Sequence, residues 1–376
     1  MSPRFLHPHT QTMSRLAVLA AVLLATATLA HAQRVPVTSA SDVARAHYVR
    51  GVHDVSYVNF PQARVHLDAA IAADPGFALA HLYRAVLSSG DQRAEHMRRA
   101  AAGPASDAER QMIEAYAANL RGDHDREEML LAGVAERFPA DPMPMFWWAN
   151  TQANRGNHAQ AVAAARRSLA ADPSFAPAYN LMGYAEMAAG NSAAAEQAFR
   201  EQIRLAPDEP NPYDSLGEFL LGQARLDDAE RQFEMALARD PGFGNGQMNL
   251  ARVAMERSDL RLEGAIADGD AAAAAALYAE DAVVMAPDAP RVRGREGIRD
   301  LMAGMIASGI DGADIQTVNV LRFDDWAVRE SNVVLSAGGQ VADRLKALEL
   351  WRLIDGDWLY VRDVFNSDGP EAGGTD

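Results

Sequence analysis

Apolar residues along this chain follow three different patterns, one after another. A continuous apolar run covers residues 16–29. From about residue 41 to residue 256, apolar residues recur with helical spacing, and glycine and proline interrupt them at regular intervals. After about residue 257 the pattern changes to a pair of helices and then to alternating apolar and polar positions, which are typical of strands. These patterns predict a short leader, a helical array and a separate α+β domain.

The helical part of the chain repeats with a period of 34 residues. Pro139, Pro173, Pro207 and Pro241 are each 34 residues apart, and Pro75 lies close to two periods before Pro139. Two consecutive units agree position by position, with Tyr179, Gly183, Gly190, Ala195 and Phe199 matching Tyr213, Gly217, Ala224, Ala229 and Phe233. The period predicts five or six helix pairs from Ser41 to Pro241, with residues 76–107 as a degenerate unit, and a further helix from Gly246 to Arg257.

These spacings resemble the tetratricopeptide repeat, in which a small residue lets the second helix approach the first and an aromatic residue fills the seam. The resemblance implies an α-helical solenoid over residues 41–256, with a concave groove that binds a protein or peptide. The alternative is that the array is only a spacer or a dimer platform. Residues 143–148 carry more apolar bulk than one seam requires, so they are either core or a partner anchor. The candidate groove residues are Phe146, Trp147, Asn180 and Asp214.

The last part of the chain, residues 257–369, predicts helices followed by an antiparallel meander. Helices are expected at Ala271–Tyr278 and Arg295–Met305, and a short strand at Asp281–Met285. Further strands are expected at Ile315–Leu321, Trp326–Leu335, Val341–Leu353 and Trp358–Phe365. This order describes a small α+β domain, with residues 370–376 as a disordered tail.

Four stretches of this domain resemble the SnoaL-like branch of the nuclear transport factor 2 superfamily. They are residues 265–270, 277–282, 293–298 and 351–367. The resemblance implies a cone in which a bent antiparallel sheet packs on helices around a pocket. The superfamily includes isomerases, cyclases, dehydratases, hydrolases and members without known activity, so the fold alone says little about function.

The dipeptide Asp355-Gly356 predicts a two-residue hairpin, which would pair Glu349 with Arg362 across two strands. An acid and an arginine among aromatic residues suit the wall of a ligand pocket. The alternative is a surface cross-strand ion pair. The candidate pocket residues are Tyr278, Trp326, Glu349, Trp351, Tyr360, Arg362 and Asp363.

Ketosteroid isomerase is a member of this superfamily whose chemistry can be compared with the sequence residue by residue. The resemblance places the catalytic base of that enzyme on Ala286 and its oxyanion tyrosine on Leu262, and neither residue can do that work. The position of its second oxyanion acid falls on Glu349. We therefore expect no proton transfer of the ketosteroid-isomerase type, and the catalytic residues of any other reaction are unknown.

Composition excludes several other chemistries. The chain has no cysteine, so disulfides and thiolate sites are absent, and all ten histidines lie at or before His158. The C-terminal domain thus has no imidazole, and the sequence predicts no metal and no cofactor. A net charge of −16 argues against nucleic-acid binding and favours basic partners for the array. The single lysine, Lys346, is expected to be a solvated strand residue rather than a nucleophile.

Residues 1–32 predict a cleaved signal peptide. Arginines precede the apolar run, and Ala30-His31-Ala32 follows it as a cleavage site, so the mature chain is expected to begin at Gln33. Residues 16–29 are too few to span a bilayer, because a spanning helix needs about 20. The expected location is therefore periplasmic or secreted, with no membrane span.

The sequence favours an exported scaffold that holds a partner in its groove and carries a non-catalytic domain that binds a small apolar ligand or forms a homodimer. One alternative is an isomerase-, cyclase- or hydrolase-like enzyme whose acid is Glu349 or Asp363. Another is a purely structural domain whose pocket is filled by Trp326, Trp351 and Trp358.

Overall fold

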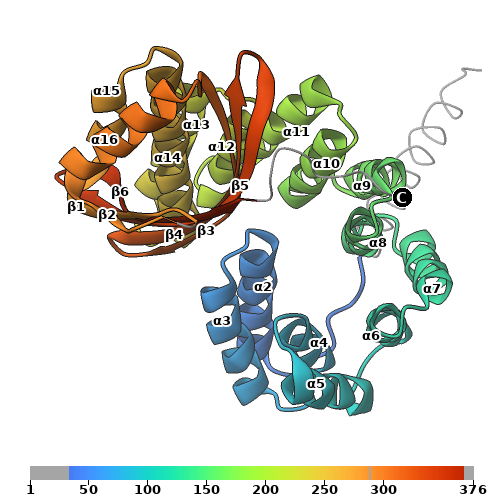
Figure 1. Cartoon of the computed structure of the whole chain (residues 1–376). Helices are drawn as coiled ribbons and strands as arrows, with labels where there is room; N and C mark the ends of the chain where they lie inside the picture. Colours follow the sequence, from blue (N-terminus) through green and yellow to red (C-terminus); the bar gives the residue numbers. More distant parts are fainter. Residues whose placement is uncertain (1–33, 288, 368–376) are drawn as a thin grey trace, which may run out of the picture. The chain divides into compact units, whose positions relative to one another are not determined.

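The computed structural model describes residues 34–287 and 289–367, so the predicted leader and C-terminal tail lie outside the described residues. The described chain divides into two compact units. The first unit ends at Ser215, and the second begins at Leu216. Figure 1 shows the order of the elements in colour from α2 to β6.

The first unit consists of successive helix pairs, each joined by a short turn. Their bounds are α2 Asp42–Ser56, α3 Phe60–Ala73, α4 Ala78–Val86, α5 Gly90–Ala102, α6 Asp107–Leu120, α7 His124–Arg137, α8 Met143–Asn154, α9 His158–Ala171, α10 Ala176–Ala188 and α11 Ser192–Leu205. The next helix, α12 (Pro210–Gly222), crosses the division between the units. The sequence predicts a degenerate repeat at residues 76–107, and this segment forms the helix pair α4 and α5.

Glycines of the 34-residue period have two separate structural roles. Gly122, Gly156 and Gly190 follow α6, α8 and α10 with φ angles of +75°, +75° and +81°, which glycine adopts without a steric penalty. Gly183 on α10 faces Phe199 on α11, and a Cβ there would lie 2.6 Å from the Phe199 ring. The aromatic residue therefore fills the seam because the facing position has no side chain.

The second unit combines α13 (Leu226–Arg239), the long helix α14 (Gly244–Ala267), the short helix α15 (Ala271–Ala276) and α16 (Gly294–Ala307) with one sheet. The strands are β1 Tyr278–Met285, β2 Val292–Arg293, β3 Gly312–Phe323, β4 Trp326–Ala337, β5 Gln340–Ile354 and β6 Asp357–Ser367. Figure 1 shows α14, α15 and α16 against one face of this sheet, and apolar residues of both layers form a common core.

The strand order is β2-β1-β6-β5-β4-β3. Strands β3 to β6 form the antiparallel meander that the sequence predicts, and both Asp355 and Gly356 have positive φ angles, as a type I′ hairpin requires. β1 departs from the expected antiparallel sheet because it pairs with β6 in parallel. The connection between β1 and β6 runs through α16 and the meander rather than through a hairpin, so the two strands need not be antiparallel.

We call the helices α14, α15 and α16 and the six-stranded sheet the cone. α14 is one continuous helix that is both the last helix after the repeats and the first helix of the cone. The sequence places a domain boundary near residue 257, which falls inside α14. No proline interrupts residues 244–267, and Ala251 and Met255 already belong to the core that the cone's helices share with its sheet. The cone is therefore built with helical residues that precede the boundary drawn from the sequence.

Candidate functional site

A bulge in β6 decides which side chains face the interior of the cone. Trp351 pairs with Tyr360 as the hairpin predicts, but Leu350 then pairs with Arg362, so Val361 is an extra residue on β6. Because side chains alternate between the two faces of a strand, this extra residue exchanges the faces beyond it. Asp363, not Arg362, lies opposite Glu349. The predicted pair of Glu349 with Arg362 is therefore wrong.

The arginine that binds Glu349 is Arg329, on the neighbouring strand β4. Arg329 is fully buried and lies across from Glu349 in the sheet. Its Nε donates to Glu349 Oε2, its Nη1 donates to Asp259 Oδ2 at 2.5 Å, and its Nη2 donates to Asp259 Oδ1 at 3.0 Å. Asp259 comes from α14, so this network ties the helix to the sheet. Burial raises the pKa of Asp259 to about 6, although Arg329 opposes the shift.

The remaining polar contacts of this network are satisfied inside the cone. The Tyr360 hydroxyl donates to Asp259 Oδ1 at 2.9 Å and accepts from Arg329 Nη2 at 3.0 Å. Ser331 Oγ donates to Glu349 Oε1 at 2.6 Å. Every charged atom of Arg329 and Glu349 thus meets an opposite charge or a hydroxyl, which is what a buried ion pair needs to be tolerated.

Neither Asp259 nor Arg329 is among the residues that the sequence analysis selected. Arg329 could have been found from the alternation of β4, because Ala327, Arg329 and Ser331 share a face with Glu349 once the strands are paired. Asp259 could not, because its position depends on how α14 packs on the sheet.

A second acid, Asp363, lies beside this network, and none of the residues that the structure describes forms an ion pair with it. Its Oδ2 accepts a hydrogen bond from the Tyr278 hydroxyl at 2.8 Å. Burial and the nearby Glu349 raise the pKa of Asp363 to about 7. Burial likewise raises the pKa of Tyr278 well above its usual range. Asp363 is therefore partly protonated near neutral pH, which is unusual for a carboxyl group.

The cavity of the cone has a volume of about 70 Å³ and an apolar wall with a few polar groups. Of the predicted pocket residues, Tyr278, Glu349, Tyr360 and Asp363 line it, together with Leu262. Trp326, Trp351 and Arg362 do not line it. Trp351 is fully buried in the core, Trp326 packs against that core, and the Arg362 Nη1 donates to the backbone oxygen of Val361. The cavity lies beside the tryptophans rather than being filled by them.

Leu262 and Ala286 occupy the two positions at which the resemblance places the catalytic groups of ketosteroid isomerase. Leu262 lies in the cavity wall, where it offers an apolar surface and no hydrogen-bond donor. Ala286 follows the end of β1 and does not line the cavity. An acid and a phenol do lie together in the cavity wall, namely Asp363 on β6 and Tyr278 on β1.

The first unit contains a larger hollow, with a volume of about 530 Å³. We call it the groove. Most of its lining residues, from α2 to α10, are aromatic, aliphatic or asparagine, and a few are hydroxyl or acidic. They are Val55, Ser56, Val58, Phe60, Tyr83, Val86, Tyr116, Asn119, Glu127, Met143, Phe146, Trp147, Asn150, Thr151, Ala153, Asn154, Asn180, Leu181 and Tyr184. Three of the four predicted partner contacts, Phe146, Trp147 and Asn180, are in this set. Asp214 is not, and it is 2% exposed.

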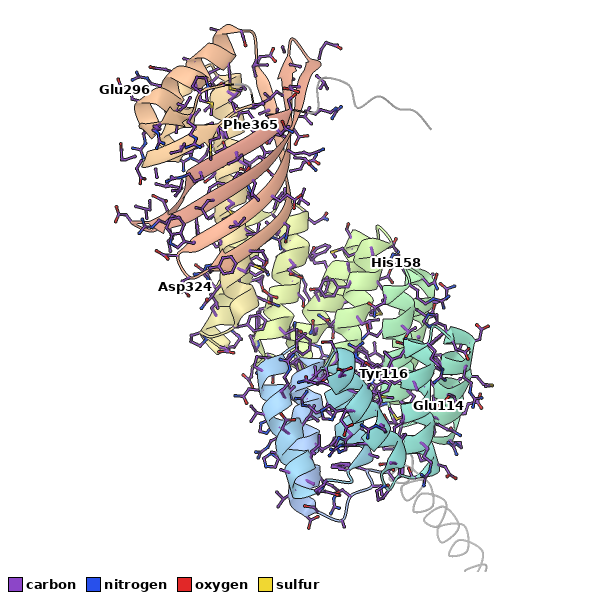
Figure 2. The ribbon with its side chains drawn as sticks, turned by 60° about the horizontal axis from the view of Figure 1, so that its bottom comes forward. Glu114, Tyr116, His158, Glu296, Asp324 and Phe365 are labelled. Atoms are coloured by element: carbon purple, nitrogen blue, oxygen red, sulfur yellow. The ribbon has the colours of Figure 1, made fainter. Side chains whose placement is uncertain are left out.

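Two sets of contacts fix the floor of the groove. The ring of Trp147 lies edge-on to Tyr83 and to Tyr116, with centroid distances of 5.6 and 6.3 Å. Buried Glu127 accepts hydrogen bonds from Thr151 Oγ1 at 2.6 Å and from Asn119 Nδ2 at 3.0 Å. The floor is therefore preorganised. Figure 2 marks Tyr116 and Glu114 on α6, one of the helices that supply the groove.

Within residues 34–287 and 289–367, no three His, Asp or Glu side chains come together in a way that could hold a metal ion. Over the same described residues, every helix is too short or too polar to cross a membrane.

Family models match one segment in each part of the chain. Residues 176–209 match the family model of the tetratricopeptide repeat, and residues 261–361 match that of the SnoaL-like domain. No curated protein sequence gives a significant match.

Several solved structures are similar to part of the chain. The structure of PilW, a type IV pilus biogenesis factor, is 19% identical, with 55% of this chain and 98% of PilW covered and a TM-score of 0.37. The MamA protein is 19% identical, with 40% and 82% covered and a TM-score of 0.35. A ketosteroid isomerase-like protein from Erwinia carotovora atroseptica is 21% identical, with 31% and 95% covered and a TM-score of 0.28. Likeness of this extent carries no information about function.

Proposed function

We propose that this chain, which carries tetratricopeptide repeats followed by a SnoaL-like domain, is an exported scaffold. It holds a protein partner in the groove of the repeats and a small apolar ligand in the cavity of the cone. The observation that carries the proposal is the difference between the two hollows. The groove offers about 530 Å³ and the cavity about 70 Å³, so only the groove has room for a peptide segment.

The chemistry of the groove wall suits an extended peptide. Phe146, Trp147 and Tyr184 provide large apolar surfaces of the kind that anchor partner side chains at protein interfaces. Asn150 and Asn154 are exposed on α8, and each amide can both donate to and accept from a peptide backbone. The wall has no lysine or arginine among the described lining residues, so recognition does not depend on a partner's carboxylate.

A matched pair of arginine substitutions tests the role of the groove. Peptides selected from a random display library against the full chain would be tested for binding by fluorescence anisotropy. Asn150→Arg fills the groove and should weaken binding at least tenfold. Gln160→Arg, an exposed position on α9 outside the groove, adds the same charge and should leave binding unchanged. Selected peptides that bind both variants equally well would contradict the proposal.

An enzymatic role of the cone is the second candidate, because Asp363 has a pKa of about 7 and faces a cavity. A carboxyl group that titrates near neutral pH is suited to general acid–base catalysis. The cavity restricts such a reaction to a substrate far smaller than a steroid. A reaction of such a substrate that Asp363→Asn abolishes, while ligand binding persists, would give this role precedence over binding alone.

A homodimer is a further candidate because large apolar residues are exposed on the outer face of the sheet. Leu321 and Phe323 on β3 are 52% and 60% exposed, and Leu348 on β5, the second strand along from β3, is 55% exposed. A second copy of this chain could cover them. Sedimentation equilibrium of the full chain and of Leu348→Glu tests this, since a dimer through this face should dissociate in the variant.

A further inference from the structure

Asp363 presents one carboxylate oxygen to the cavity of the cone. Its Oδ2 accepts the hydroxyl hydrogen of Tyr278, and no described residue donates a hydrogen bond to its Oδ1. The residue is 9% exposed and lines the cavity, and Asp363 Oδ1 is not among the described side-chain atoms that are both buried and without a hydrogen-bond partner. The cavity is therefore where Oδ1 can find a partner.

The charges around the cavity do not balance. Asp259, Glu349 and Asp363 bring three carboxyl groups, and among the described residues only Arg329 opposes them inside the cone. Arg329 directs its donors to Asp259, Glu349 and the Tyr360 hydroxyl. The cavity wall carries two carboxyl groups and two phenols, but no described lysine, arginine or histidine. With all three carboxyl groups ionised, the described interior would lack two positive charges, and Asp363 is the acid that Arg329 does not contact.

We propose that the cavity binds a small apolar amine whose ammonium group donates to Asp363 Oδ1 and whose hydrocarbon part packs against the apolar wall. This inference rests on the proposed ligand-binding role of the cone and names the class of ligand. Leu262, Met302 and Phe365 offer the apolar contacts, from α14, α16 and β6. Figure 2 shows Phe365 on the sheet. The rings of Tyr278 and Tyr360 add surfaces that attract a cation.

An ammonium group fits the electrostatics better than a neutral hydrogen-bond acceptor does. The raised pKa of Asp363 reflects burial together with the repulsion of Glu349, which an added positive charge would offset. The charged and titratable groups around Asp363 are Tyr278 on β1, Arg329 on β4, Glu349 on β5 and Tyr360 on β6. Of these, only Arg329 is a cation, and it is bound to the other acids.

The two ligand classes predict opposite pH dependences. An ammonium group needs ionised Asp363, so its affinity should rise about tenfold between pH 6 and pH 8 as a carboxyl of pKa about 7 loses its proton. An alkylamine stays charged over this range, because its pKa is about 10. A neutral acceptor needs the protonated acid, so its affinity should fall about tenfold over the same interval.

Isobutylamine is a probe of suitable size, because engineered cavities of about 150 Å³ hold benzene and this one is smaller. Isobutanol and isopropyl methyl ketone are neutral compounds of similar shape. Ligand-observed NMR with the full chain would measure the affinity of each compound at pH 6 and pH 8. We expect isobutylamine to bind most tightly at pH 8, at least tenfold more tightly than either neutral compound.

Two variants locate the binding. Asp363→Asn keeps the shape of the side chain and should abolish amine binding. Glu296→Gln removes the same charge from the exposed surface of α16 (Figure 2) and should leave binding unchanged. Tyr278→Phe removes the hydrogen bond that favours ionised Asp363, so the pH midpoint of amine binding should move upward.

The possible results separate this inference from the function on which it rests. Equal or tighter binding of a neutral compound would overturn the amine assignment and leave a ligand-binding cone intact. Binding of none of the three compounds would overturn the amine assignment and the ligand-binding role together. Amine binding that persists in Asp363→Asn, or that does not change between pH 6 and pH 8, would show that Asp363 is not the anchor.

Discussion

At the scale of single residues, buried acids control how the cone responds to pH. Asp363 holds its proton up to about pH 7 in the folded state, whereas an unfolded aspartate loses it near pH 4. Between these values the folded state binds more protons than the unfolded state, so stability falls as pH rises. Above pH 7 both states are ionised and this contribution is constant.

The first prediction concerns this pH dependence. Asp363→Asn cannot ionise, so the decrease in the free energy of unfolding from pH 4 to pH 8 should be smaller in the variant, by roughly 3 to 4 kcal/mol. Urea denaturation of the cone, followed by fluorescence, measures it at both pH values. Glu296→Gln is the control and should follow the wild type. If the free energy of unfolding changed equally with pH in the wild type and in Asp363→Asn, Asp363 would be ionised in the folded state at both pH values.

A second residue-scale feature is Ala224, which occupies the turn position that glycine holds in the preceding repeats. Its φ angle is +56°, in the left-handed region, whereas Gly190 has the equivalent place one period earlier. The left-handed conformation costs a residue with a Cβ about 1–2 kcal/mol of folding free energy. Glycine avoids this cost, but it loses about 0.5–1 kcal/mol because it has more conformational freedom in the unfolded chain.

The second prediction follows from this difference. Ala224→Gly should raise the free energy of unfolding by about 0.5–1 kcal/mol, and the reverse change, Gly190→Ala, should lower it by about 1 kcal/mol. A Cβ at Gly190 meets no atom within 4 Å, so the effect there comes from the backbone alone. Thermal unfolding of both variants tests the pair. Shifts of the same sign would rule out backbone strain as the cause.

At the scale of elements, an extended segment that precedes α2 binds the acidic turns of the first unit. Backbone nitrogens of Val35 and Thr38 donate to Asp141 at 2.9 Å and to Glu109 at 2.7 Å. The Arg34 guanidinium donates a hydrogen bond to Asp172, and the Ser39 hydroxyl donates one to Asp74. Figure 1 shows this segment running from α2 toward α8. Residues 34–41 therefore bridge several repeats.

The third prediction tests Glu109 as the principal contact of this segment. Glu109 is fully buried and also accepts from the Thr38 hydroxyl and from the backbone nitrogen of Ser106. Glu109→Gln replaces a charged acceptor and should lower the free energy of unfolding by about 2 kcal/mol. Limited proteolysis should also cut residues 34–41 faster. Glu136→Gln, exposed on α7, is the control, and equal cleavage rates in the two variants would disagree with this role.

The fourth prediction concerns α14, the helix shared by the end of the array and the cone. A fragment of residues 257–376 is expected to fold from its separate periodicity, but it lacks Ala251 and Met255 of the core. In this fragment Asp259, which binds Arg329, would lie in the first turn of the shortened α14 helix. A fragment of residues 244–376 should therefore melt at a higher temperature. Equal melting temperatures by circular dichroism would show that the first part of α14 contributes nothing to the cone.

At the scale of the whole molecule, export is a proposal that rests on residues 1–32, which lie outside the described residues. The arginines, the apolar run and the Ala-x-Ala sequence support it. Two units without cysteine also suit an oxidising compartment, where no thiol is at risk.

The fifth prediction is that the mature protein begins at Gln33. Mass spectrometry of protein from the periplasmic or secreted fraction should give a mass that corresponds to cleavage after Ala32. Replacing Ala30 and Ala32 with bulky residues should leave the precursor uncleaved. Protein that starts at Met1 or Met13 and stays in the cytoplasm would contradict export.

Local signals determined much of this architecture. The 34-residue period fixed the helix pairs because each pair buries its apolar stripe against its neighbours, so the same spacing must return in every unit. Alternation located β3 to β6, and Asp355-Gly356 located their last hairpin, because both depend on residues close in sequence. The apolar bulk of residues 143–148 left Phe146 and Trp147 as either core residues or partner anchors, and both line the groove.

Tertiary structure alone decided the chemistry inside the cone. Because Val361 is an extra residue on β6, Asp363 rather than Arg362 lies on the inner face of the sheet. No local preference in the sequence marks that bulge. Arg329 lies 70 residues from Asp259 in the chain, and their contact depends on how α14 packs against β4. Strand faces and helix packing are settled by the total burial of apolar surface, to which every element contributes, so the residues that surround the cavity could not be read from any one segment.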